Sequence, residues 1–117
     1  MKKELKFIAS VLLICSAVYS ASFENLYPIN DKKGGGYINK DGSIIIEQKY
    51  GFTQRFIGNY AIVELNNKYG VIDKSGNIVI KAQYDDLKNL NENFVVYEKD
   101  GKFGYIDILK KQKSDNK

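Results

Sequence analysis

The sequence predicts an all-β protein, an antiparallel β-meander built from 34-residue β-hairpin repeats and preceded by a signal-peptide helix. Two observations lead to this fold class. Residues 36–69 match residues 70–103 without a gap, with ten identities over the 34 aligned positions. Within each copy, short runs of β-branched residues such as 44–46 and 78–80 lie between turn residues, a pattern typical of strands. The chain therefore holds two full units and a partial unit at each end.

Glycines at regular positions favour hairpins over helices. A period of 34 residues is also that of a helical hairpin repeat, but such a helix would carry a glycine every few turns. Gly42, Gly76 and Gly101 each follow a polar pair and suit the left-handed residue that closes a hairpin turn. Asn67 takes the place of Gly101 in the preceding unit, and asparagine is the residue that best tolerates left-handed geometry after glycine.

Strands are expected between these turns. Their predicted ranges are 26–30, 36–39, 43–47, 60–65, 68–73, 77–81, 94–98 and 102–107. The longer connections, 48–59 and 82–93, are predicted to be surface loops with apolar residues tucked under the sheet.

The N-terminal segment has the pattern of a secretory signal peptide. Residues 1–20 contain three lysines followed by an apolar run that is too short to span a bilayer as a helix. Small residues favour cleavage after Ser20 or Ser22. The alternative is a lipoprotein acylated at Cys15, although Ile14 stands where that pattern has a small residue. We therefore predict an exported protein, periplasmic or extracellular, with the lipoprotein as the alternative.

The positive charge lies at the two ends of the chain. The net charge of +4 divides into +2 for residues 1–20, +3 for residues 110–117 and −1 for residues 21–109. A nucleic-acid groove needs basic residues on the folded body, so this class of partner is excluded. We predict a signal peptide at 1–20, a β-repeat domain at 21–109 and a disordered basic tail at 110–117.

The recurring residues resemble those of the WG-repeat family of bacterial β-repeat proteins. They are Gly42, Tyr50, Tyr69, Gly70, Gly76, Tyr84, Phe103 and Gly104. The chain departs from the family pattern where its tryptophans stand, with Gly35, Tyr69 and Phe103 in their place. The resemblance implies a β-repeat architecture and a structural or interaction role, since the family has no established catalytic residues.

Aromatic residues are predicted to supply the core. The rings of Tyr69 and Phe103 are expected to fill core volume while the glycine after each lets a ring or backbone lie against it. On that basis Phe103→Ala should cost roughly 3–5 kcal/mol of stability. We also expect the strand tyrosines to pack against the sheets rather than bind a ligand, and these are Tyr37, Tyr60, Tyr97 and Tyr105.

Groups for catalysis are scarce. The chain has no His, and its one Cys lies in the predicted signal peptide, so the usual catalytic triads and zinc sites cannot form. Asp85 and Asp86 are adjacent, an arrangement more typical of turn capping than of paired acid–base catalysis. We therefore expect no enzyme activity, no cofactor and no metal.

By exclusion, the sequence favours a non-catalytic exported module that binds a protein or a surface polymer at the cell envelope. Partner contacts are predicted in the two loops, at Thr53, Gln54, Arg55, Leu87, Lys88 and Asn89, where the repeats differ most. The alternative is a structural or self-associating fragment of a longer repeat array with no small-molecule ligand. The open edge of strand 102–107 would then join copies into a homo-oligomer.

Overall fold

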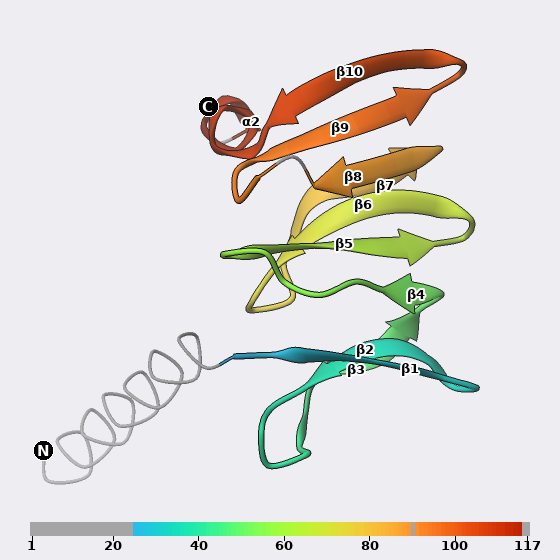
Figure 1. The fold of residues 1–117 in the computed structure, drawn as a ribbon, viewed down its shortest axis with the longest axis vertical. Coiled ribbons are helices and arrows are strands. Elements are labelled where there is room, and N and C mark those ends of the chain that lie inside the picture. Colours follow the sequence, from blue (N-terminus) through green and yellow to red (C-terminus); the bar gives the residue numbers. More distant parts are fainter. Residues whose placement is uncertain (1–24, 90, 116–117) are drawn as a thin grey trace, which may run out of the picture.

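The computed structural model describes residues 25–89 and 91–115, which form three antiparallel sheets and one short helix. The predicted signal peptide, 1–20, lies outside the described residues. The strands are β1 (Tyr27–Asp31), β2 (Gly34–Ile38), β3 (Ile44–Tyr50), β4 (Phe52–Thr53), β5 (Tyr60–Leu65), β6 (Lys68–Asp73), β7 (Ile78–Tyr84), β8 (Asp86–Asn89), β9 (Phe94–Lys99) and β10 (Lys102–Asp107). Strand orders are β1-β2-β3, β4-β5-β6-β7 and β10-β9-β8. In Figure 1 the sheets follow one another along the long axis, with β1–β3 and β8–β10 at opposite ends.

The 34-residue repeat seen in the sequence is also a repeat of strand pairing. Paired positions recur one period apart: Gly35↔Tyr50 with Tyr69↔Tyr84, Tyr37↔Ile46 with Val71↔Ile80, and Ile38↔Ile44 with Ile72↔Ile78. The two pairings also share the same register shifts, so both units bend at the same point. The fold is therefore a succession of equivalent β units, as predicted, although the meander divides into three sheets rather than forming one.

One polar residue organises the β2–β3 turn, and its counterpart one unit later organises the β6–β7 turn. The side-chain oxygen of Asn39 accepts hydrogen bonds from backbone N–H groups two and four residues later, both at 3.0 Å, and Asp73 does the same at 2.9 Å. The turns then pass through Gly42 and Gly76, whose φ angles are 83° and 85°. Such angles are left-handed and favour glycine.

The third copy of this turn becomes a helix. Helix α2 (Ile108–Asp115) directly follows Asp107, whose side-chain oxygen accepts hydrogen bonds from the backbone N–H groups of the second and third residues after it. The side chain of Ile108 is buried, and the hydroxyl of Tyr60 donates to the side-chain oxygen of Gln112 at 2.9 Å. The prediction of a disordered tail at 110–117 is therefore wrong for 110–115, because a cap and an apolar anchor precede the lysines.

The predicted loops at 48–59 and 82–93 contain strand residues at 48–50, 52–53, 82–84 and 86–89, so the loop prediction is wrong for these residues. One residue, Gly51 or Asp85, separates β3 from β4 and β7 from β8. The backbone N–H of Gly51 donates to the carbonyl of Glu64, and that of Asp85 to the carbonyl of Glu98, both at 2.8 Å. Backbone pairing thus continues where the chain passes from one sheet to the next, so no long connection is needed.

Two buried clusters hold the sheets together. The first cluster combines residues of β5 to β9 with the helix anchor: Tyr60, Ile62, Val71, Val79, Ile80, Leu87, Val95 and Ile108. The second cluster joins β2, β3, β5 and β6 with the residue before β1: Leu26, Tyr37, Ile46, Tyr50, Ala61, Val63 and Ile72. Adjacent residues such as Val71 and Ile72 fall in different clusters because side chains alternate across a strand. The middle sheet is therefore covered on both faces.

Candidate interaction surface

The glycine of each aromatic–glycine pair allows a close approach, as the sequence suggested. A Cβ added at Gly70 would lie 2.5 Å from the carbonyl oxygen of Ile80, and one added at Gly104 would lie 2.7 Å from the ring of Tyr97. The first contact is with backbone and the second with an aromatic ring. Any larger residue would displace these neighbours.

The aromatic partners of these glycines have different environments. Tyr69 is half-buried and packs against the first cluster. Phe103, its counterpart one unit later, is 72% exposed. The prediction that Phe103 fills the core is therefore wrong, and with it the expected cost of Phe103→Ala.

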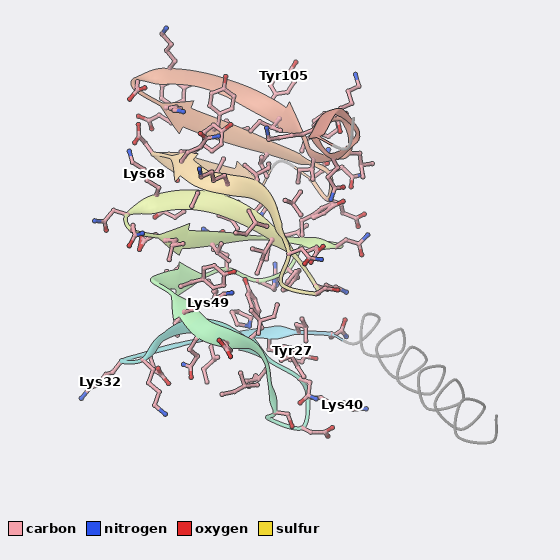
Figure 2. The ribbon with its side chains drawn as sticks, turned by 180° about the vertical axis from the view of Figure 1, so that it is seen from behind. Tyr27, Lys32, Lys40, Lys49, Lys68 and Tyr105 are labelled. Carbon is pink, nitrogen blue, oxygen red and sulfur yellow. The ribbon has the colours of Figure 1, made fainter. Side chains whose placement is uncertain are left out.

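One register position shows why the last unit differs. Tyr37, Val71 and Tyr105 are 34 residues apart, at the same place in three successive units, and their exposed fractions are 0%, 1% and 71%. The next β unit covers this position in the first two copies, while no described element covers it in the third. Figure 2 shows Tyr105 projecting outward at the end of the molecule. The expectation of sheet packing therefore holds for Tyr37, Tyr60 and Tyr97, which are buried or half-buried, and is wrong for Tyr105.

Tyr105 belongs to a wider apolar surface, which we call the end face. It consists of Phe94, Val96, Phe103 and Tyr105. Tyr105 pairs with Val96, so their side chains share one face of the sheet, and the rings of Phe94 and Tyr105 are 6.5 Å apart. The counterparts one unit earlier are covered by the first cluster or form part of it: Tyr60, Ile62, Tyr69 and Val71. The end face thus repeats a surface that is internal elsewhere in the molecule.

The six residues predicted to contact a partner do not form one exposed site. Thr53 and Leu87 are buried, and the hydroxyl of Thr53 donates to the carbonyl of Gly36 at 3.2 Å, so predicting partner contacts by these two side chains is wrong. Gln54 is half-buried, and its carbonyl accepts a hydrogen bond from the hydroxyl of Tyr37. Arg55, Lys88 and Asn89 are exposed.

The sequence reasoning did not identify the end face, although the repeat itself carried a usable signal. The aromatic residues of 102–107 occupy positions that a following unit would cover, and 108–117 do not continue the turn pattern of such a unit. Comparing the third copy with the first two would have predicted exposed aromatic residues there.

A cavity of about 280 Å³ lies on one face of the middle sheet. Its apolar walls include Val63, Leu65, Ile72, Ile78 and Ile80, and Tyr50 contributes from β3. We call this the Val63 pocket. The hydroxyl of Tyr50 is buried and has no hydrogen-bond partner among the described residues, and burial raises its pKa above that of an ordinary tyrosine.

Among the described residues, ionisable groups form one close pair on the surface. The ammonium of Lys68 donates to the carboxylate of Asp85. This hydrogen bond raises the pKa of Lys68 and lowers that of Asp85, which also accepts from the backbone N–H of Asp100 at 2.9 Å. The neighbouring Asp86 approaches Lys88 at 3.8 Å instead. The two aspartates therefore have separate cationic partners and do not face each other as an acid–base pair.

Within 25–89 and 91–115, no group of three or more Cys, Asp or Glu side chains is placed to hold a metal ion. In that same part of the chain, no helix has the length and apolarity required to cross a bilayer.

The sequence pattern of the WG containing repeat family matches this chain twice, at residues 36–69 and 69–103. The chain belongs to the WG containing repeat family. The matched ranges agree with the two units defined by strand pairing. The WG repeats of this chain place Tyr69 and Phe103 directly before Gly70 and Gly104, where the family has tryptophan. Comparison with curated proteins gives no match, and comparison with solved structures gives none either.

Proposed function

We propose that this WG-repeat protein is a non-catalytic exported module that binds a protein partner at the cell envelope through its end face. The observation that carries the proposal is the exposure of Tyr105, whose counterparts Tyr37 and Val71 are covered by a β unit. A surface of this kind is already suited to contact with protein, since a neighbouring unit provides that contact twice within the chain. For this reason we favour a protein partner over a surface polymer.

Three further features support the proposal. The chain has no His, and Asp85 and Asp86 pair with separate lysines, which agrees with a non-catalytic role. The lysines and apolar run within residues 1–20 support export, as a property of the sequence. Rigid aromatic side chains such as Phe103 and Tyr105 also lose little conformational entropy on binding, which favours their use as contact residues.

Site-specific photo-crosslinking in the producing cell tests this function. A benzophenone amino acid is placed at position 105, and in a matched control at position 52, where Phe52 is an exposed aromatic outside the end face. We expect a discrete adduct from 105 and none from 52. The adduct is identified by mass spectrometry, and its purified partner is then titrated with the wild-type chain and with Tyr105→Ser.

Loss of a buried aromatic contact should weaken partner binding by about tenfold or more. Phe52→Asp, which copies Asp86 of the second unit, should leave binding unchanged. Equal adducts from both positions, an adduct with a polysaccharide, or unchanged binding by Tyr105→Ser would each contradict the proposal.

Self-association is the second candidate, and a specific observation favours it. Tyr27 in β1 is 47% exposed, whereas its counterparts Ala61 and Val95 are buried. Both ends of the array thus have surfaces that are internal elsewhere, and Figure 2 places Tyr27 and Tyr105 far apart along the molecule. Contact between the end face of one copy and the β1 end of another would be head-to-tail and open-ended.

Sedimentation velocity over a wide concentration range distinguishes the two functions. Self-association predicts larger species at higher concentration that are lost in both Tyr27→Ser and Tyr105→Ser. Strand β10 also lies at an edge of its sheet, as the sequence predicted. Self-association by backbone pairing between β10 strands of two copies would persist in both variants, because neither substitution changes the backbone. A monomer at every concentration contradicts self-association in either form and leaves the protein partner as the proposal.

A further inference from the structure

The two WG repeats differ at one position that decides whether a pocket exists. Val63 lies opposite Gly70 in the β5–β6 pair, and Tyr97 lies opposite Gly104 in the β9–β10 pair. In the second repeat the ring of Tyr97 lies over Gly104. In the first repeat the smaller Val63 stands at that position, and the Val63 pocket of about 280 Å³ opens beside it.

The second repeat also indicates what fits such a space. The ring of Tyr97 packs against that of Tyr84, with centroids 5.2 Å apart and the planes tilted by 49°. Tyr50 is the counterpart of Tyr84, and it lines the Val63 pocket. The first repeat thus retains the tyrosine against which a ring packs and lacks the ring itself.

The rim of the pocket carries cations. Lys68 and Lys81 both line it, together with Asn66 of the adjoining turn. Lys68 is paired with Asp85, whereas no ion pair is found for the exposed Lys81 among the described residues. None of the described residues that line the pocket has a carboxylate side chain. An occupant with a negative charge next to its apolar part would therefore meet a favourable field at the opening.

We propose that the Val63 pocket binds a small aromatic carboxylate, with the ring against Tyr50 and the carboxylate towards Lys81. The ring would replace the one that Tyr97 supplies in the second repeat, and a space of this size holds a single ring with a short chain. This site lies between the first two sheets, away from the end face, so the inference does not depend on the proposed partner.

Titration of the isotope-labelled full chain by NMR tests the proposal. The probe is 3-(4-hydroxyphenyl)propionate, compared with 3-(4-hydroxycyclohexyl)propionate, which has a saturated ring, and with 4-ethylphenol, which has no charge. We expect the first probe to bind with a dissociation constant of about 1 mM, as its few atoms allow. Nuclear Overhauser effects should join its ring to the methyl groups of Leu65 and Ile78, the apolar lining residues with exposed side chains. The saturated probe should bind at least threefold more weakly.

Two substitutions separate the parts of the proposal. Val63→Tyr copies the second repeat and should fill the pocket, so that binding falls by more than tenfold, while Phe52→Tyr adds only a hydroxyl elsewhere and should have no effect. Lys81→Gln should weaken the carboxylate probe about twofold to fivefold and leave 4-ethylphenol unchanged.

Binding that persists in Val63→Tyr, or equal binding of the saturated ring, would overturn the aromatic site. An equal effect of Lys81→Gln on the charged and neutral probes would overturn the preference for a carboxylate. If Val63→Tyr does not fold, the Overhauser effects of the wild-type chain still test the proposal. Contacts of the probe only with residues outside the Val63 pocket would overturn it.

Discussion

The side-chain oxygen of Asp107 accepts a hydrogen bond from the backbone N–H of Lys110 at 3.3 Å. One unit earlier, Gly76 follows Asp73 at the same spacing and donates its N–H to the Asp73 carbonyl at 3.0 Å. The aspartate is common to both sites, but glycine takes the left-handed turn far more easily than lysine. With lysine at this point the chain continues as α2, so the repeated turn is lost where the turn glycine is missing.

Asp107→Ala should destabilise the protein by about 1 kcal/mol, since alanine cannot accept the N-terminal N–H groups of α2. Urea denaturation followed by circular dichroism measures this loss. Asp107→Asn keeps a side-chain acceptor and should retain most of the stability. The cap would be refuted if the asparagine variant were as unstable as the alanine variant.

Gly70→Ala should destabilise the protein by roughly 1–3 kcal/mol, because the new methyl group would lie 2.5 Å from the backbone oxygen of Ile80. Gly101→Asn is the control. Gly101 has a φ of 77° with nothing close to its Cβ, and Asn67 already adopts a φ of 66° at the equivalent turn. Thermal unfolding should show a small loss for Gly101→Asn and a large one for Gly70→Ala, and the reverse order would contradict this account of the two glycines.

Phe103→Ala should change stability by no more than about 0.5 kcal/mol, because the ring is exposed. Ile72→Ala, which removes a buried side chain of the second cluster, should cost about 2–5 kcal/mol. Chemical denaturation of both variants at low protein concentration checks the difference. A loss of several kcal/mol in Phe103→Ala would mean that the end face is covered in solution.

These contrasts show which parts of the fold the sequence predicts. The 34-residue period and the turn glycines predict the hairpins, since turn chemistry is local. The same pattern cannot predict whether a face is covered, because coverage depends on the unit that follows. Phe103 and Tyr69 have similar sequence surroundings, yet within the described part of the chain only Tyr69 has a sheet beyond it.

The missed elements have local causes. Strands β4 and β8 contain few residues and show no clear alternation, so they read as loops although backbone pairing holds them. Helix α2 depends on the cap at Asp107 and the anchor at Ile108, which a lysine-rich composition hides. The Val63 pocket arises from the difference in side-chain size between Val63 and Tyr97, visible in the alignment only once the two are known to lie opposite glycines.

The Lys68–Asp85 pair should make stability depend on pH. The hydrogen bond from Lys68 holds the folded-state pKa of Asp85 below its ordinary value. Its contribution is therefore present above about pH 4 and is lost as the pH falls through the lowered pKa. The pKa of Lys68 is raised, so the contribution also fades at alkaline pH, beyond the ordinary range of lysine.

Asp85→Asn should accordingly reduce the difference in unfolding free energy between pH 6 and pH 3. Lys68→Gln should reduce it in the same direction, because each substitution removes the pair. Asp31, whose pKa is lowered chiefly by the side chain of Gln48, should keep part of the acid sensitivity in both variants. A pH dependence equal to that of the wild type in Asp85→Asn would show that the pair has no influence on stability.

The most direct test of the account is the solvent exposure of two tyrosine rings at the same repeat position. Ring protons are followed by NMR at low protein concentration in the presence of a soluble paramagnetic agent. Strong relaxation of Tyr105 and protection of Tyr37 are the predicted result, because a β unit covers only the latter. Equal protection of both rings would contradict the uncovered end face, and with it the proposed interaction surface.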